Sequence, residues 1–415
     1  MSYYKKAIRS WLFYDWANSA FATTIMAALL PFYYSQVAAA SLSPTIATSY
    51  WGYTNSIATF LMIFLAPILG AIADYKRLKI KFLAVFIFLG VIFTSFLFFV
   101  EKNDWFLASI LFIIAHTGFW GANIFYDSLL PFIATRNNIN KISTDGYAYG
   151  YLGGGLLLAI NMIMIEYPQL FFISDAQMAI RISFLTVGVW WGIFSIPILI
   201  NINEPLIKHI LPEKQNPVIA AFKSLQITFK SLKRYRNAFI FLLAFWLYND
   251  GINTVIVMAA IFGAEIGIDK GNLIMAILAV QFVGIPFTIL FGKLANKINT
   301  KKAIYIGLTV YSLFSIAAFF IKTALHFWIL AMVVAMVQGG TQALSRSLFT
   351  NLIPKEKSAE FFSFFDVSQK FSAVLGPAIF GIIGQLTGSS RFGIVALVLF
   401  FVGGMIILRK VTVND

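Results

Sequence analysis

The sequence predicts an all-α integral membrane protein whose twelve transmembrane helices form two pseudo-symmetric bundles of six. Hydrophobic residues make up 60% of the 415 positions and charged residues only 12%, about half of the ~25% that soluble domains carry. The apolar residues gather in about twelve runs, each near the ~20 residues that a helix needs to cross a hydrocarbon core. This composition excludes soluble and disordered proteins. The continuous runs also exclude an outer-membrane β-barrel, whose strands alternate in hydrophobicity.

Each run predicts one helix in chain order. Positive charge precedes the first run, as in a signal peptide, but the run is long and Asp15 interrupts it, so we expect an uncleaved helix. In the fifth run Gly146, Gly150 and Gly154 recur every four residues, a spacing typical of close helix packing. Gly376-Pro377 predicts a kink in the eleventh. The expected helices span 11–36, 50–73, 81–100, 105–133, 146–165, 180–202, 238–262, 273–292, 303–321, 327–352, 361–387 and 392–409.

The polar stretch 203–237 divides six runs from six and contains seven basic residues. We therefore expect an N-terminal bundle at 1–202, a linker at 203–237 and a C-terminal bundle at 238–415. The loops on the side of the N-terminus hold 24 of the 31 Lys and Arg residues, and the opposite loops hold 4. Because basic loops stay in the cytoplasm, both termini and the linker are predicted to be cytoplasmic, in a multi-pass protein of the cell inner (plasma) membrane. The net charge of +14 therefore reports topology and does not indicate a nucleic-acid partner.

The two halves carry matching segments. GAIADYKRLK at 70–79 matches GKLANKINTKK at 292–302, and GANIFYDSL at 121–129 matches GTQALSRSL at 340–348, at offsets of 222 and 219 residues. A fainter match, DWANS at 15–19 with DGINT at 250–254, has an offset of 235. It requires a longer connection after the first helix, or it is chance. Two similar bundles imply a cavity between them and alternating access.

Segment 70–79 resembles the G-x-x-x-D-(R/K)-x-G-(R/K)-(R/K) loop of the major facilitator superfamily, with Tyr75 and Leu78 replacing the usual basic residue and glycine. Four further strings are similar to the branch of that superfamily that includes the autophagy-related vacuolar amino-acid effluxers and their bacterial relatives. They are YDWANSAF at 14–21, GYLGGG at 150–155, LYNDG at 247–251 and GGTQALSRS at 339–347. The resemblance spans nearly the whole chain. It implies the major facilitator fold and secondary transport and favours amino acids, but it does not fix the substrate.

Charged residues inside the expected helices are the main site candidates, because a charge at that depth costs several kcal/mol unless it is paired or faces a cavity. They are Asp15, Asp127, Arg181, Asp250, Arg346, Asp366 and Lys370. Asp127 and Arg346 occupy equivalent places on the fourth and tenth helices, which line the cavity in this superfamily, so they would face each other across it.

The Asp127 and Arg346 pair has two interpretations. In a substrate clamp, Arg346 offers a planar fork to a carboxylate and Asp127 accepts from an ammonium. In a cytoplasmic gate, the two form a structural ion pair. Both interpretations stay open. The other substrate-binding candidates are Asn18, Trp120, Asn123, Tyr126, Asn253 and Gln342.

Four residues are candidates for proton coupling. Asp250 lies some 12 residues into its helix, or ~18 Å at 1.5 Å per residue, where a carboxyl group has no surface explanation. Asp15 is the second carboxyl candidate. Asp366 and Lys370 are four apart and share a helix face, so they form either an internal pair or a coupling site. Arg181 begins the sixth helix and either snorkels outward or contacts substrate.

The repeated loop predicts a conformational latch made of Gly70, Asp74, Lys76 and Arg77, with Gly292 and Asn296 in the second copy. A carboxylate at a helix end can pair with a cation or a helix N-terminus in one state and release it in the other. The alternative is a solvated basic turn that only sets topology.

We therefore expect a monomeric secondary active transporter that moves a small polar or zwitterionic, amino-acid-like solute by proton-coupled symport or antiport. The alternatives are transport of an organic anion or of a metal chelate such as a siderophore, and an integral-membrane enzyme. The enzyme would need a clustered His, Asp and Glu constellation, whereas the three histidines are dispersed. Without cysteines or a G-x-x-x-x-G-K-[ST] motif, we expect no thiolate metal site and no ATP drive. Protons, the solute and the lipid bilayer are the expected partners, and no cofactor or metal is expected.

Overall fold

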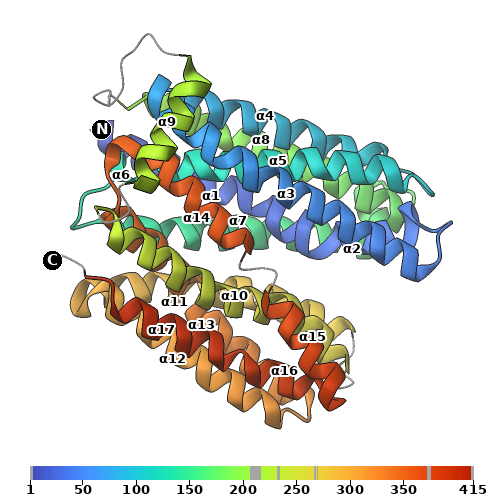
Figure 1. Ribbon diagram of the computed structural model, residues 1–415. Helices are drawn as coiled ribbons and strands as arrows, with labels where there is room; N and C mark the ends of the chain where they lie inside the picture. Colours follow the sequence, from blue (N-terminus) through green and yellow to red (C-terminus); the bar gives the residue numbers. More distant parts are fainter. Residues whose placement is uncertain are drawn as a thin grey trace. The chain divides into compact units, whose positions relative to one another are not determined.

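The computed structural model describes residues 3–205, 216–230, 234–265, 268, 270–371 and 375–412. The regular structure of these residues is entirely helical (Figure 1). Eleven helices within them are long and apolar enough to cross a membrane. The first predicted helix, 11–36, is divided among α1 (Tyr3–Ala20), the π-helix η1 (Phe21–Leu29), α2 (Leu30–Tyr33) and the π-helix η2 (Tyr34–Ala38). The predicted all-helical membrane fold is therefore confirmed.

Most helices begin earlier or end later than their apolar runs, because helical hydrogen bonding continues into polar residues at the membrane surface. These elements are α3 (Pro44–Lys76), α4 (Lys79–Phe96), α7 (Ile139–Glu166), α8 (Ala176–Asn201), α10 (Arg236–Glu265), α11 (Lys270–Ile298), α12 (Thr300–Ala317) and α13 (Ala324–Leu352). Of these, α4, α8 and α12 begin earlier but also end earlier than predicted. Two predicted helices are each divided in two: α5 (Trp105–Ser128) and α6 (Leu130–Ile133), α16 (Ser390–Ala396) and α17 (Val398–Arg409). The described parts of the eleventh are α14 (Ser358–Phe371) and α15 (Leu375–Thr387). The predicted linker contains one unexpected helix, α9 (Pro217–Lys230).

Residue contacts divide the chain into two compact units. The first comprises Met1–Leu129 and Tyr149–Ala220, and the second comprises Leu130–Ala148 and Ala221–Asp415. The boundaries fall inside α7 and α9, so the first ten residues of α7 pack with the second unit. The bundles predicted at 1–202 and 238–415 remain a prediction about domains.

Small residues bring the helices of the first unit together. A Cβ atom on Gly118 of α5 would lie 2.4 Å from the backbone nitrogen of Gly90 on α4. A Cβ on Gly90 would in turn lie 2.0 Å from the Trp191 ring of α8. The predicted glycine spacing in α7 also serves packing, because a Cβ on Gly154 would lie 2.9 Å from the carbonyl oxygen of Ser19. The absence of side chains at these points lets the helices approach closely.

Aromatic rings form the core of the second unit. Phe365 of α14 stacks on Phe245 of α10 with ring centroids 4.3 Å apart, and on Phe349 of α13 at 5.1 Å. All three side chains are buried. This core fixes α10, α13 and α14, the three helices that carry Asp250, Arg346 and the Asp366–Lys370 pair.

We predict that Gly118→Ala destabilises the protein, because the added methyl meets backbone atoms of α4 and not the movable end of a side chain. Overpacking of this kind costs about 1–3 kcal/mol. The matched control is Gly52→Ala on α3, where nothing lies within 4 Å of the added atom. Thermal unfolding of detergent-purified protein should show a lower midpoint for Gly118→Ala alone. Equal midpoints for the two variants would mean that α4 and α5 are not in this contact.

Candidate functional site

The first unit contains a polar cluster between α1 and α5. The hydroxyl of Tyr126 donates a 2.6 Å hydrogen bond to Oδ2 of Asp15, and Nδ2 of Asn18 donates a 2.6 Å bond to Oδ1 of Asn123. Trp11 stacks on Tyr126 with ring centroids 4.4 Å apart. Four sequence-predicted site residues therefore meet here, and three of them had been predicted as substrate ligands.

Two other candidates lie on α5 in the same unit. Asp127 follows Tyr126 directly and is half-buried. Nε1 of Trp120 donates a 3.0 Å bond to Nε2 of His116, one turn earlier on α5. This pairing gives His116 a structural partner within its own helix. Among the residues that the structure describes, no three His, Asp or Glu side chains lie in a position to hold a metal ion.

Arg346 is buried in the second unit and is held by the first turns of α7. Its Nε donates a 2.9 Å bond to Oγ of Ser143, and its Nη2 donates a 3.0 Å bond to the Ser143 carbonyl oxygen. The guanidinium carbon lies 4.7 Å from the centroid of the Tyr147 ring, a cation–π geometry. Ser143 Oγ donates in turn to the carbonyl oxygen of Ala343 at 2.7 Å. One serine thus receives two arms of the guanidinium fork.

Asn140, one turn before Ser143, joins α7 to three further elements. Its Nδ2 donates to Oδ1 of Asn296 at 3.1 Å, while its Oδ1 accepts from Thr300 at 3.1 Å and from Ser347 at 2.5 Å. A Cβ on Gly292 would lie 2.2 Å from Oγ1 of Thr144. The structure therefore brings the second copy of the predicted latch, Gly292 and Asn296, onto the same helix segment that holds Arg346.

Asp250 is fully buried on α10. Its Oδ1 accepts a 2.8 Å hydrogen bond from the backbone nitrogen of Gly376, whereas its Oδ2 has no hydrogen-bond partner among the described residues. A Cβ on Gly376 would lie 1.9 Å from Oγ1 of Thr254 and 2.7 Å from Oδ1 of Asp250. Only glycine leaves room for this approach. The carboxyl group is thus held by a neutral backbone amide.

Asp366 and Lys370 form the internal pair that their spacing predicts. The ammonium of Lys370 lies 2.9 and 2.8 Å from the two carboxylate oxygens of Asp366, and both residues are buried. The remaining candidates, Asn253 on α10 and Gln342 on α13, are half-buried.

The first copy of the predicted latch forms an ion pair within its own loop. Asp74 Oδ1 contacts the ammonium of Lys79, whose side chain is fully buried. Glu204, just after α8, accepts from the backbone nitrogens of Lys79 at 2.9 Å and Ile80 at 2.8 Å. A carboxylate at this position stabilises the start of α4.

One detail of the motif alignment was wrong. The residue with left-handed backbone geometry is Arg77, with φ of +57°, so Arg77 and not Leu78 stands where the loop motif has its glycine. The ammonium of Lys76 lies over the ring of Tyr75, 5.3 Å from the ring centroid. Gly70 lies on α3, one turn before Asp74.

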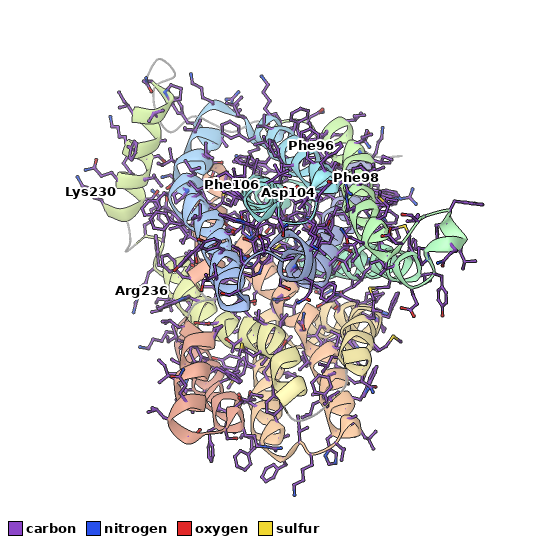
Figure 2. All side chains as sticks on the ribbon, turned by 90° about the vertical axis from the view of Figure 1, so that its right-hand side faces the viewer. Phe96, Phe98, Asp104, Phe106, Lys230 and Arg236 are labelled. Atoms are coloured by element: carbon purple, nitrogen blue, oxygen red, sulfur yellow. The ribbon has the colours of Figure 1, made fainter. Side chains whose placement is uncertain are left out.

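Arg181, near the start of α8, is held by contacts with Phe98, just after α4, and with Glu101. Its Nε donates to the Phe98 carbonyl oxygen at 2.6 Å, and its Nη2 lies 3.2 Å from Glu101. Figure 2 shows Phe96, Phe98, Asp104 and Phe106 gathered at this part of the first unit. A small groove here, lined by Phe96, Phe99, Leu107 and Leu111, is apolar. It offers no group that would bind a polar solute.

Sequence reasoning missed the residues that organise these sites. They are Asn140, Ser143, Tyr147, Glu204, Lys357 and Glu360. All lie just outside or at the ends of apolar runs, where polar residues are ordinary. The one available signal was Asn140 and Ser143 together, spaced by three on the approach to the fifth helix.

Comparison with known proteins gives a consistent result over the whole chain. A family model described as "Vacuole effluxer Atg22 like" matches residues 3–415. The uncharacterized MFS-type transporter YxiO of Bacillus subtilis is 38% identical over 414 residues, which cover 99% of this chain and 96% of that protein. Autophagy-related protein 22 of Yarrowia lipolytica is 24% identical over an alignment that covers 84% of this chain and 73% of that protein. The Escherichia coli fucose:proton symporter has a similar fold, with a TM-score of 0.74 at 13% identity and full coverage of both chains.

We predict that Asp74→Asn destabilises the protein by about 3–5 kcal/mol, because it leaves the buried Lys79 ammonium without its carboxylate. The matched control is Asp145→Asn, which breaks the more exposed Lys141–Asp145 pair and should cost about 1 kcal/mol or less. Adding Lys79→Met to Asp74→Asn should recover most of the loss. Equal unfolding midpoints for Asp74→Asn and Asp145→Asn would show that the Asp74 pair contributes no more than an exposed one.

Proposed function

Because the chain belongs to the vacuole effluxer Atg22-like family of MFS-type transporters, we propose that it moves a small zwitterionic, amino-acid-like solute by proton-coupled alternating access. The proposal of proton coupling rests on the surroundings of the Asp250 carboxyl group. This carboxyl group is fully buried and held by a backbone amide, with no hydrogen-bond partner on Oδ2 among the described residues. A carboxyl group in such surroundings changes charge only at a large cost in solvation. Gain or loss of its proton therefore has the energy needed to bias one conformation over another.

The hydrogen bond from Gly376 also connects Asp250 on α10 to the start of α15. The charged form of Asp250 attracts the backbone amide of Gly376 more strongly than its neutral form does. Protonation would weaken the hold of α10 on the start of α15, and deprotonation would strengthen it. Asp366, a buried carboxylate on α14, is neutralised by Lys370 and is the weaker candidate.

The substrate carboxylate is proposed to bind Arg346. The guanidinium donates to two acceptors of Ser143, its hydroxyl and its carbonyl oxygen. A substrate carboxylate that took the same two arms would therefore replace Ser143. Binding of substrate and closure of the α7 segment on α13 then exclude each other. In this proposal Arg346 binds Ser143 when the gate is closed and binds the substrate carboxylate when the gate is open. The matching ammonium site is proposed at Asp127 in the first unit.

The chain is proposed to lie in the cell inner membrane with both termini in the cytoplasm, as the charge of its loops indicates. Ser43 and Asn137 are exposed and lie on opposite predicted sides. Because the chain has no cysteine, a single Cys at either position can be labelled in intact cells with an impermeant reagent. We expect labelling of Ser43→Cys and protection of Asn137→Cys. The reverse pattern would overturn the orientation.

Asp250→Asn should abolish substrate accumulation driven by a pH gradient while substrate exchange between equal internal and external pools continues. The amide keeps the size and the hydrogen bond to Gly376 but cannot give up a proton. The measurement uses proteoliposomes with an imposed pH gradient, with Asp366→Asn measured in parallel. Gradient-driven accumulation by Asp250→Asn at the level of the unchanged protein would remove Asp250 from the proton path.

Arg346→Lys should weaken binding of the zwitterion nearly as much as Arg346→Ala, because lysine keeps the charge but loses the two-armed fork. Each charge-assisted bond lost should cost about 1.5–3 kcal/mol, or roughly 10- to 150-fold in Kd. The substrate is first found by thermal-shift screening against amino acids, organic acids and metal chelates. Its Kd is then compared with that of the amine that lacks the carboxylate.

Ser143→Ala provides the control for Arg346. It removes one competing acceptor and leaves the arginine in place, so the Kd of the zwitterion should fall by about fivefold, equivalent to about 1 kcal/mol. The hypothesis that Arg346 acts only as a gate predicts different results. Lysine would then largely replace it, and neither Ser143→Ala nor removal of the substrate carboxylate would change the Kd.

A further inference from the structure

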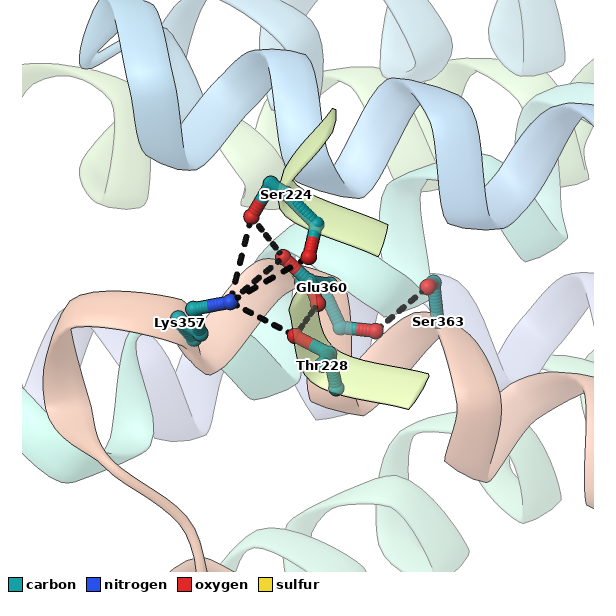
Figure 3. Close-up of polar contacts among 5 residues, drawn as sticks. All are labelled: Ser224, Thr228, Lys357, Glu360 and Ser363. Carbon is teal, nitrogen blue, oxygen red and sulfur yellow. Dashed lines mark hydrogen bonds and ion pairs between the residues drawn. The ribbon is translucent and has the colours of Figure 1, made fainter. Parts of the chain in front are cut away.

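Helix α9 is held against the second unit by a buried polar cluster (Figure 3). Ser224 Oγ donates a 2.6 Å bond to Oε2 of Glu360, and Thr228 Oγ1 donates to Oε1 of the same carboxylate. The ammonium of Lys357 donates to Thr228 Oγ1 at 2.6 Å and lies 3.6 Å from Glu360 Oε2. Glu360 is fully buried and Lys357 is 3% exposed. A buried ion pair completed by two hydroxyl groups fixes the position of this face of α9.

The cluster also fixes the depth of α9. Lys357 and Glu360 lie in the polar first turns of the candidate membrane span Lys355–Thr387, so we expect the helix that they hold to lie near the point where that span enters the membrane. The next span begins at Arg236, six residues after Lys230 ends α9. Six residues reach at most about 20 Å. Both attachments keep α9 at the membrane surface.

The opposite face of α9 is apolar and basic. Val218, Ile219 and Phe222 are 47%, 64% and 55% exposed. Lys223, Lys230 and the uncharged Gln226 are exposed on the same side of the helix, and α9 contains no acidic residue. At about 100° per residue, Ile219 lies in the middle of this face, with Phe222 on one flank and the lysines on the other. Apolar side chains beside lysines are the composition of a helix that lies in a membrane interface.

We propose that α9 is an interfacial helix that binds the anionic lipid of the leaflet on the side of the N-terminus. Ile219 and Phe222 enter the boundary between headgroups and acyl chains, while Lys223 and Lys230 pair with lipid phosphates. A lipid surface fits better than a protein partner because the Glu360 cluster and the adjoining span hold the helix at headgroup depth. The basic flank also complements an anionic leaflet. Lipid composition would then act on α14 through Ser224 and Thr228.

The absence of cysteine in the chain permits a direct test on the whole protein. Ile219→Cys and Phe222→Cys are labelled with bimane and reconstituted with phosphatidylcholine alone or with added phosphatidylglycerol. Quenching is measured with nitroxide lipids and with aqueous iodide. Ile200→Cys, at a position 71% exposed on the span α8, is the lipid control, and Asn137→Cys, on an exposed loop, is the water control.

We expect both α9 positions to follow the lipid control, with stronger nitroxide quenching when phosphatidylglycerol is present. Because each lysine near an anionic surface strengthens binding by about fivefold, Lys223→Gln with Lys230→Gln should lose the gain from phosphatidylglycerol. Iodide quenching equal to the water control would overturn the proposal. Protection from both quenchers would overturn it as well, because a second copy of the chain or another protein would then cover this face. Neither readout depends on transport, so the result is independent of the proposed substrate and coupling.

Discussion

Charge inside a low-dielectric environment is the constraint on which this structure depends. A lone ion there costs several kcal/mol, and the folded chain meets that cost locally, within single elements or neighbouring helices. Asp366 is neutralised one turn away by Lys370, Asp74 pairs with Lys79 in the same loop, and Glu360 pairs with Lys357. Two of these pairs also attach separate segments. The Asp74–Lys79 loop adjoins the cap that Glu204 places on α4, and Glu360 holds α9 through two hydroxyl groups.

Asp250 is held differently from these pairs, and this difference supports its proposed role. Arg346 donates to the hydroxyl and the carbonyl oxygen of Ser143, and Asp250 accepts from the backbone amide of Gly376. Neutral partners stabilise a charge less than an opposite charge does. A substrate carboxylate that takes the two arms held by Ser143 would replace neutral acceptors with a charged one. A proton can compete for Asp250 at a smaller cost than breaking a buried ion pair. Both groups lie in one unit, on helices joined by the Phe245, Phe349 and Phe365 stack.

The sequence predicts most of the fold but only part of the site. Runs of apolar residues locate the spans because hydrophobic length is a physical requirement of the bilayer, and the spacing of Asp366 and Lys370 predicts their pair because helix geometry is regular. The role of Asn140 was missed because its three partners come from separate helices, and its spacing of three from Ser143 does not say which helices those are. The αL geometry of Arg77 was missed because the alignment placed the glycine of the loop motif at Leu78. Whether Asp127 pairs with Arg346 stays a prediction.

The central claim is that Asp250 exchanges a proton during the transport cycle. Infrared difference spectroscopy of the reconstituted protein between alkaline and acidic buffer measures this directly, through the C=O stretching band of a protonated carboxyl group. We predict a band that appears on acidification, shifts when substrate binds, and is absent in Asp250→Asn while it persists in Asp366→Asn. An unchanged band in Asp250→Asn, or loss of the band in Asp366→Asn instead, would contradict the account.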